Sequence, residues 1–554
     1  MNAHPLALIF AMSAVLVPDL ASAAAPDAGM AAPDAALAAT VARRLHGDRT
    51  GACMAVAVVE RGQVARSYQC ADAAQATRIG PDSAFEIGSI SKTMVSTLLA
   101  QLVLEGKGSL DDTLASWLPE GTPVPDFNGQ PILLRHVVTH TSGLPALPSR
   151  LGASSMDDPY ANLDAQALLA SLGEVTLSAA PGSAFEYSNF ASMVLSYAVA
   201  RRAGTDLETL LRQRLFAPLG MDRAYIGKPP AGVRAASGHA PNGKAVPAWR
   251  FATDLAGVGG VRATLDDMVA YVQAGLGWKG PQLQPAIALS HAPLSSQPPM
   301  AMNWMLASAN GRQVLMHEGG TGGFSAFVSI DPQRGRGVVI LSDTSWNSIG
   351  SLGSLGLHLV DEAFPLGKPR RETPADPALL EALAGPYQLQ DAMKMELRAR
   401  DGVLYIQAEG QDEHAMGHDD AGDFYPRDFD AVLRPQRKAD GRHAFTWTQM
   451  GGVMQAARID ASRPAAPAPT AAQLAAYAGT YPLMPGFDLA VRVQGDSLHA
   501  QATGQGAFPL QAGAADAFEA PAYGIEILFR RDVSGKVESL ELHQGGQVLR
   551  GRRQ

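Results

Sequence analysis

The sequence predicts an α+β fold followed by two small antiparallel β-barrels. Three observations lead to this prediction. Long apolar helices are predicted from residue 89 and from about residue 189, and strands joined by a glycine-rich turn are predicted over 314–343. Beyond residue 364, helical segments give way to short alternating strands, and one stretch of such strands occurs twice.

Length, composition and charge bound the classes of function. The chain has 554 residues, more than one ordinary domain holds, and its 46% apolar and 18% charged residues are typical of a globular protein. The net charge is -9 and there is no basic stripe, so we expect no nucleic-acid partner. The histidines show no ligand spacing such as His-Glu-x-x-His, so we expect no metal, and no other cofactor is needed.

The N-terminus has the pattern of a secretory signal peptide. An apolar core over residues 6–17 precedes Ala21-Ser22-Ala23, a small-residue pattern that is typical of a cleavage site. The core is too short to span a bilayer, and no cysteine follows it closely enough to carry a lipid. The sequence therefore predicts a signal peptide over 1–23, no membrane anchor, and a periplasmic or secreted protein.

The only two cysteines flank a predicted β-hairpin. Strands over 54–60 and 63–69 surround the turn Arg61-Gly62, and counting outward places Cys53 opposite Cys70. This is a non-hydrogen-bonded pair, where side chains approach most closely. In an exported protein we expect a disulfide, with two free buried thiols as the alternative.

The first of three motifs is Ser89-Ile90-Ser91-Lys92. The segment from Ser89 to Leu104 predicts a helix, which places Lys92 one turn from Ser89 on the same face. A serine hydroxyl needs a base, and a lysine whose pKa is depressed by burial can be one. The alternative is a serine helix cap followed by a solvated lysine. The almost wholly apolar helix that follows favours a buried, functional lysine.

The second motif is Tyr187-Ser188-Asn189, between the turn Pro181-Gly182 and an apolar helix. A loop that enters a helix can present side chains to a cleft. Tyr187 can exchange a proton with the nucleophile or leaving group, and Asn189 can orient Lys92 and a substrate amide. The alternative is a packed tyrosine and an asparagine cap. A second Tyr-x-Asn occurs at Tyr160-Ala161-Asn162, and the turn and helix favour Tyr187.

The third motif is His317-Glu318-Gly319-Gly320, in a predicted strand, turn and strand over 314–331, with a third strand at 337–343. Gly319 and Gly320 let a substrate lie against the backbone. The amides of Gly320 and Ser89 can form an oxyanion hole. His317 is expected to point into the cleft as a donor or electrostatic anchor. The alternative is a surface β-hairpin.

In this order the motifs resemble those of the penicillin-recognising serine hydrolases of the class C β-lactamase and DD-peptidase type, with the pattern Ser-x-x-Lys, Tyr-x-Asn, Lys/His-x-Gly. Segments 134–145, 259–268 and 302–304 support the resemblance, which covers about residues 36–363. It implies a β-lactamase/transpeptidase-like domain over 24–366. In that fold a helical subdomain packs on an antiparallel sheet, with the active site between them.

The resemblance also implies roles for the motif residues. Ser89 is acylated, Lys92 and Tyr187 share the proton transfers, and Asn189 positions them. His317, Glu318 and Gly319 line the substrate side. Glu318 stands where a hydroxyl residue is usual, so its carboxylate would favour an amine or a neutral ester if it faced the cleft.

The C-terminal part of the chain contains an internal repeat. Residues 380–389 (LEALAGPYQL) recur as 474–483 (LAAYAGTYPL), and each copy continues with alternating strands. A Pro/Ala linker, 461–470, separates the copies. We predict lipocalin-like barrels over 374–462 and 470–554, a build that accompanies some hydrolases of this type. They either bind a ligand or, as we favour, cover the catalytic domain and restrict its cleft. Phe424, Tyr425 and Phe429 either reach toward the site or pack in a core.

These features predict an exported serine hydrolase that works through a Ser89 acyl-enzyme. The expected substrates are D-amino-acid-containing peptides or cell-wall fragments, as for DD-carboxypeptidases and D-aminopeptidases. One alternative is a β-lactamase or carboxylesterase that uses the same site. The other is a catalytically weak protein that binds wall fragments.

Overall fold

The computed structural model describes most of the chain. It covers residues 34–153, 155, 157–389, 393–437, 443–449, 452–459, 470–484, 487–495, 497–503, 506–512, 516–520, 525–532, 534–544 and 547–554. The predicted signal peptide and residues 461–469 of the predicted linker lie outside these ranges. Within them, no helix combines the length and apolar character needed to cross a membrane.

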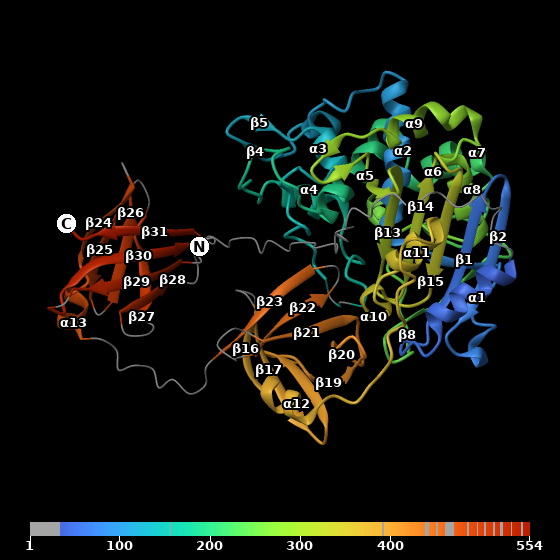
Figure 1. Cartoon of the computed structure of the whole chain (residues 1–554). Coiled ribbons are helices and arrows are strands. Elements are labelled where there is room, and N and C mark those ends of the chain that lie inside the picture. Colours follow the sequence, from blue (N-terminus) through green and yellow to red (C-terminus); the bar gives the residue numbers. More distant parts are fainter. Residues whose placement is uncertain are drawn as a thin grey trace. The chain divides into compact units, whose positions relative to one another are not determined.

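The chain divides into two compact units (Figure 1). The first comprises residues up to 384 together with 395–457, and the second comprises 385–394 with 458–554. The first unit therefore contains the segments that carry the three motifs and most of the first repeat.

An eight-stranded sheet forms the centre of the first unit, in the order β10-β11-β12-β13-β14-β15-β1-β2. Its neighbouring strands pair antiparallel. The strands are β1 Cys53–Glu60, β2 Gln63–Cys70, β10 Ser295–Ser296, β11 Pro299–Met300, β12 Met305–Ala309, β13 Arg312–Gly320, β14 Ser325–Asp331 and β15 Arg336–Ser342. Small accessory strands are β3 Ser83–Glu86, β4 Asp126–Phe127, β5 Gln130–Pro131, β6 Arg234–Ala235, β7 Gly238–His239, β8 Ala245–Val246 and β9 Arg262–Ala263.

Helices cover both faces of this sheet. One face, with Val56, Phe327 and Ile340, packs with α1 and α11 in one hydrophobic cluster. The other face, with Leu315 and Val339, belongs to the larger core that includes α2, α5 and α8. The helices are α1 Asp34–Leu45, α2 Ser91–Leu104, α3 Leu134–Val138, α4 Ala165–Leu172, α5 Asn189–Ala203, α6 Leu207–Leu211, α7 Ala217–Leu219, α8 Leu265–Gly275, α9 Gln284–His291, α10 Trp346–Ile349 and α11 Gly353–Val360.

The sheet begins with the predicted hairpin. β1 and β2 pair in the register that sets Cys53 opposite Cys70, and a disulfide joins these two residues. Arg61 and Gly62 form the turn with positive φ angles of 50° and 80°, which glycine tolerates at its position without strain.

The predicted α+β architecture with C-terminal barrels is confirmed. The strands of the first repeat are hydrogen-bonded in chain order into a closed barrel, and those of the second repeat form an eight-stranded sheet. The first set is β16 Gly385–Leu389, β17 Met393–Arg400, β18 Val403–Ala408, β19 Glu413–His418, β20 Phe424–Pro426, β21 Ala431–Arg437, β22 His443–Gln449 and β23 Gly452–Arg458. The second set is β24 Gly479–Met484, β25 Phe487–Gln494, β26 Ser497–Ala502, β27 Phe508–Ala512, β28 Ala517–Ala520, β29 Ile525–Arg531, β30 Val537–Gln544 and β31 Gln547–Arg552.

The sequence repeat has a structural cause. Each copy starts with a short helix, α12 (Pro377–Leu383) or α13 (Ala471–Ala475), and continues into the first strand of its sheet. That strand carries a fully buried tyrosine in each copy, Tyr387 and Tyr481. A buried aromatic side chain at the same point of each copy explains why the motif Ala-Gly-x-Tyr recurs.

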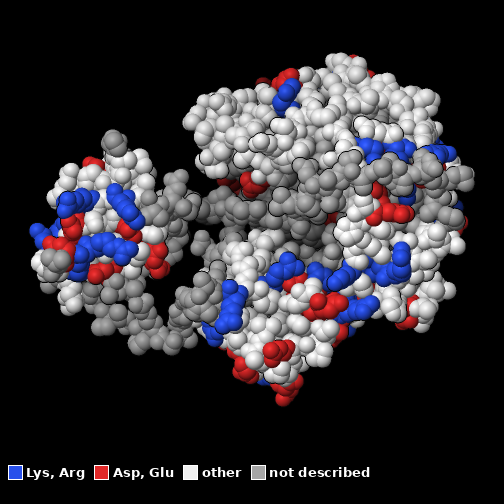
Figure 2. Space-filling model, in the orientation of Figure 1, with Lys and Arg blue, Asp and Glu red and all other residues white. Residues whose placement is uncertain are grey.

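Charged side chains of both signs are interspersed on the face drawn in Figure 2. The described part of the chain contains surface ion pairs, such as that of Arg66 with Asp266 at 2.7 Å. A mixed surface of this kind agrees with the modest net charge of the chain.

Candidate active site

Ser89 lies in a tight turn between β3 and α2. The sequence predicted a helix from Ser89, whereas the structure has a 3-10 turn over Gly88–Ile90 and an α-helix from Ser91. The turn is fixed by Ser91, whose hydroxyl donates to the carbonyl oxygen of Gly88 at 2.8 Å. Gly88 has a φ of +52° and contacts the backbone of Gly320, where a Cβ atom would lie 2.5 Å from the amide nitrogen. The backbone of the third motif therefore reaches the serine turn directly.

Lys92 is buried beside Ser89. Its Nζ atom lies 2.8 Å from Oγ of Ser89 and donates to the carbonyl oxygen of Val258 at 2.7 Å. The side chain is 1% exposed, and burial lowers its pKa well below the usual value. A lowered pKa favours the neutral amine, whose lone pair a general base needs.

Tyr187 packs over the same lysine. The Nζ atom of Lys92 lies 5.0 Å from the centre of the tyrosine ring. Burial raises the pKa of the phenol, and a hydrogen bond with Ser89 partly offsets this effect. The phenol therefore stays protonated and can give a proton rather than act as an anion.

Asn189 begins α5, and Ser188 rather than Asn189 caps this helix, accepting a hydrogen bond from the amide of Ala191 at 2.9 Å. The Asn189 side chain hydrogen-bonds the hydroxyl of Tyr160, whose pKa burial raises to about 12. Its Oδ1 atom is buried and has no partner among the residues that the structure describes. An unpaired buried acceptor is costly, and a substrate N–H group is a suitable donor for it.

His317 lies on β13, with its Nδ1 atom 2.6 Å from the carbonyl oxygen of Glu318. Burial, and secondarily the proximity of Lys92, lower the pKa of His317 to about 3. The ring is therefore neutral, with Nδ1 donating and Nε2 left as an acceptor. It can serve as a polar contact in the site, and its lowered pKa favours this role over that of a cationic anchor at neutral pH.

Glu318 faces the opposite side of β13, because successive side chains of a strand alternate. Its carboxylate accepts a hydrogen bond from Ser351 at 2.9 Å. It also approaches α11, where a Cβ atom on Gly353 would lie 2.5 Å from Oε1. Glu318 is 8% exposed, and its contact with Ser351 places it on the opposite face from the one that His317 presents to Lys92.

Gly319 and Gly320 lie inside β13, and the glycine-rich turn begins only at Thr321, whose amide donates to Phe324. A Cβ atom on Gly319 would lie 2.0 Å from the carbonyl oxygen of Ile87 and 3.2 Å from the amide of Ser89. β12 pairs with β13 only as far as Met316. In the described part of the chain, the β12-side edge of residues 317–320 is thus left without a strand partner.

His140 is a site residue that sequence analysis missed. Its buried ring stacks on Tyr187 with centroids 4.2 Å apart, and its Nδ1 accepts from the amide of Ser188 at 3.2 Å. Burial, with Lys92 and His317 nearby, lowers the pKa of His140 well below 6.5. Asn303 lies near His140 and donates to Ser96 on α2 at 2.8 Å. The resemblance to the family includes the segments around residues 140 and 303, but the sequence gives no reason to join them.

Two buried neutral histidines predict a stability that depends on pH. In the unfolded chain, His140 and His317 take up protons near pH 6.5, whereas the folded protein keeps them neutral to lower pH. The unfolded state then binds more protons, so the free energy of unfolding falls as pH drops from 6.5 toward 4. Each histidine contributes at most about 1.4 kcal/mol per pH unit.

Denaturant unfolding at pH 5, 6 and 7 checks this expectation. Relative to wild type, His317→Asn should lose less stability over this range, because it removes one of the histidines whose pKa is lowered in the folded protein. Parallel slopes for the two proteins would contradict the prediction.

A scan against protein families matches residues 37–347 to the beta-lactamase family. Residues 463–553 match a domain of unknown function, DUF3471. The first match includes every residue of the three motifs.

Relatives of this chain include several hydrolases. The D-alanyl-D-alanine-carboxypeptidase/endopeptidase AmpH of Escherichia coli (strain K12) is 29% identical over 312 residues, which are 52% of this chain and 78% of that protein. A beta-lactamase of the same organism is 26% identical and matches 53% of this chain and 84% of its own length. Esterase EstB of Burkholderia gladioli is 32% identical over 189 residues, 32% of this chain and 48% of that protein.

Among solved structures, a beta-lactamase/D-alanine carboxypeptidase from Yersinia pestis complexed with citrate is similar. It is 26% identical, with a TM-score of 0.46, and the match covers 57% of this chain and 94% of that chain.

Proposed function

Because this chain belongs to the beta-lactamase family of serine hydrolases, we propose that it hydrolyses its substrate through an acyl-enzyme on Ser89. The observation that carries the proposal is the 2.8 Å distance from Nζ of a buried, pKa-depressed lysine to Oγ of Ser89. A nucleophile and base within hydrogen-bond reach are the requirement for this chemistry.

The residues of the site suggest one role each. The amine of Lys92 takes the proton of the Ser89 hydroxyl while Oγ attacks the substrate carbonyl carbon. The amides of Ser89 and Gly320 stabilise the negative charge that develops on the carbonyl oxygen. Tyr187, which stays protonated, passes a proton to the leaving group and regains one from Lys92. Asn189 receives a substrate N–H group, and water then hydrolyses the ester on Ser89.

The charges of the site guide the choice of substrate. His317 is neutral, and the carboxylate of Glu318 is held by Ser351 on the other face of β13. Neither residue therefore offers a cation to a free carboxylate on the substrate. We propose that the substrate is a peptide that contains D-amino acids or a cell-wall fragment, cleaved in the manner of a DD-carboxypeptidase or a D-aminopeptidase. Because Glu318 faces away from the cleft, its carboxylate favours neither type.

Two other uses of the site follow from the relatives. Beta-lactamases and an esterase are among them, and both would use the same nucleophile on a β-lactam or a simple ester. A catalytically weak protein that binds wall fragments is the third candidate, and the complete set of catalytic side chains is the argument against it.

The proposed location is the periplasm or the exterior. The signal-peptide pattern of residues 1–23 supports export, and so does the disulfide between Cys53 and Cys70, because such bonds persist in oxidising compartments. We further propose functional domains over 24–366, 374–462 and 470–554, the last two of lipocalin-like build.

Intact-mass spectrometry of the mature protein mixed with a penicillin tests the proposal, with Ser89→Ala as the blank. A lasting adduct that the blank lacks would support a slowly deacylating peptidase. Loss of the penicillin without an adduct, abolished in the blank, would identify a β-lactamase. If D-alanyl peptides, D-amino-acid amides, penicillin and p-nitrophenyl acetate all stay intact and unattached, the proposed function is wrong.

A further inference from the structure

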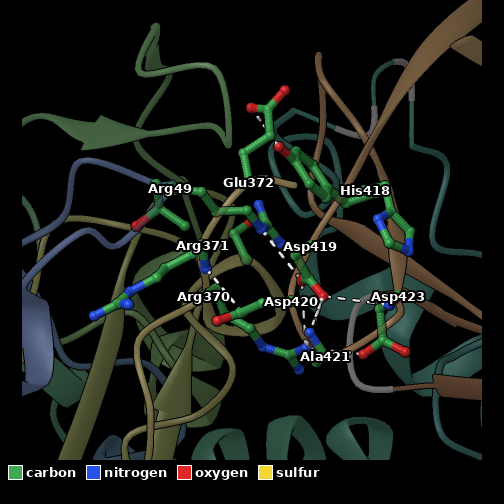
Figure 3. A network of polar contacts seen from close by, with 12 residues as sticks. Arg49, Arg370, Arg371, Glu372, His418, Asp419, Asp420, Ala421 and Asp423 are labelled. Carbon is green, nitrogen blue, oxygen red and sulfur yellow. Dashed lines mark hydrogen bonds and ion pairs between the residues drawn. The ribbon is translucent and has the colours of Figure 1, made fainter. Parts of the chain in front are cut away.

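The first barrel is fixed to the hydrolase domain by a buried network of charges (Figure 3). Arg370 donates to Asp423 at 2.9 Å and to Asp419 at 3.3 Å, and Arg49 donates to Asp419 at 3.4 Å. The carboxylates of Asp419 and Asp423 are each 1% exposed. Removing one partner of such a network leaves an uncompensated buried charge. The network therefore holds the first barrel in a fixed position on the hydrolase domain.

A second contact leads from the barrel toward the active site. Asp430, in the loop before β21, accepts four hydrogen bonds from residues of α10. Both the amide and the hydroxyl of Ser348 donate to Oδ1, at 2.8 and 2.5 Å. The amide and side chain of Asn347 donate to Oδ2, at 3.3 and 3.0 Å. One barrel side chain thus holds two consecutive residues of the hydrolase domain.

The segment after α10 is constrained on further sides. Arg44 of α1 donates to the carbonyl oxygen of Ile349 at 3.0 Å. Gly350 packs so closely on Arg370 that a Cβ atom would lie 2.6 Å from its Nε. Ser351 follows with a φ of +69°, a conformation that costs a non-glycine residue energy and persists only where the surroundings enforce it.

Ser351 is the residue that contacts the third motif. Its hydroxyl donates to Glu318 at 2.9 Å and accepts from the amide of Gly353 at 3.1 Å. Glu318 in turn orients the imidazole ring of His317, because its carbonyl oxygen accepts a hydrogen bond from Nδ1 of that ring at 2.6 Å. Contacts therefore run from Asp430 through residues 347–351 to Glu318 and His317.

We propose that Asp430 of the first barrel is a positioning residue for the active site. By holding Asn347 and Ser348, it keeps Ser351 on Glu318, and so keeps β13 and the His317 ring in the arrangement that acylation of Ser89 requires. The inference rests on the proposed function. It gives the first barrel a part in catalysis. Of the predicted aromatic cluster, Tyr425 lies against Arg49 of the hydrolase domain, with Cζ of Arg49 3.3 Å from the ring centre, and the two phenylalanines contact other aromatic rings of the barrel. Phe424 lies against His418, and Phe429 against His414 and Trp447.

The test compares Asp430→Ala, Ser351→Ala and the double variant, with Glu413→Gln as a matched control. Glu413 is a barrel carboxylate that accepts hydrogen bonds from two barrel arginines, Arg398 at 2.9 Å and Arg400. The readouts are the rate of Ser89 labelling by a fluorescent penicillin and the kcat and KM for p-nitrophenyl acetate. Thermal unfolding of each variant accompanies them.

We expect each single variant to lower the acylation rate about tenfold through kcat, with KM within about twofold of wild type. The double variant should fall about as far as either single variant, because both act on one chain of contacts. Asp430→Asn, which keeps an acceptor for Ser348, should recover at least half of the rate, and Glu413→Gln should match wild type.

Three results would overturn the inference. The first is an acylation rate of Asp430→Ala within twofold of wild type. The second is a double variant whose loss of rate equals the product of the two single losses. The third is a loss of activity that appears in KM alone, with kcat unchanged. If Asp430→Ala does not fold, the Ser351→Ala variant provides the test. An acylation rate equal to that of wild type in Ser351→Ala would also overturn the inference. A wild-type protein that neither probe acylates overturns the proposed function and this inference together. A reactive wild type with an unaffected Asp430→Ala overturns the inference alone.

Discussion

Lys92→Met is expected to lower the rate of Ser89 acylation by about 10³- to 10⁴-fold. The variant keeps a long apolar stem in the buried site but removes the amine that lies 2.8 Å from Ser89 Oγ and can take its proton. Tyr187 cannot replace it, because burial raises the pKa of the phenol and keeps it protonated. Stopped-flow labelling with a fluorescent penicillin, or hydrolysis of p-nitrophenyl acetate, measures the loss.

The pH dependence identifies the base independently. A neutral lysine is required, so the wild-type acylation rate should rise with pH through one ionisation that lies well below 10.5, the ordinary lysine value. Lys92→Arg should be as inactive as Lys92→Met, because a guanidinium stays charged. Lys107→Met is the matched control, since Lys107 lies just beyond the same helix and pairs with Glu105 at the surface. If Tyr187→Phe lowers the acylation rate as much as Lys92→Met and also shifts the rise of the rate with pH, the Tyr187 phenolate is the base instead.

Local sequence patterns were sufficient to place much of the site. The three-residue spacing of Ser89 and Lys92 brings their side chains together even though the helix starts two residues later than predicted. The short turn at Arg61-Gly62 fixed the register that pairs Cys53 with Cys70. Both cases depend on neighbours within one turn or one hairpin, where spacing alone decides which side chains meet.

Other features depend on how distant segments pack, and sequence spacing does not reveal them. Strand alternation implies that His317 and Glu318 face opposite sides, but only the positions of α2 and α11 show which side is the cleft. The stacking of His140 on Tyr187 joins residues 47 positions apart in the numbering. The contact of Asp430 with Ser348 spans 82 positions. A single aspartate in a predicted loop carries no signal of such a partner.

Close backbone packing in the site makes a small change expensive. Gly319→Ala is expected to lower the acylation rate at least about 100-fold, on the scale of losing an oxyanion-hole donor, and to reduce stability by several kcal/mol, in the range of severe point mutations. The added Cβ atom would lie 2.0 Å from the carbonyl oxygen of Ile87, which is backbone and cannot rotate away. β13 must then move from the serine turn and take the Gly320 amide with it.

Gly259→Ala is the control that separates this effect from a general intolerance of alanine. Its Cβ atom would approach the same turn, but at 3.6 Å from Gly88, an ordinary contact distance, and its φ of 177° lies outside the left-handed region. Steady-state kinetics and denaturant unfolding of both variants make the comparison. Gly259→Ala should remain near wild type in both. If Gly319→Ala also keeps wild-type acylation, the Gly320 amide is not an oxyanion donor, because β13 could not accommodate the methyl group without displacing it.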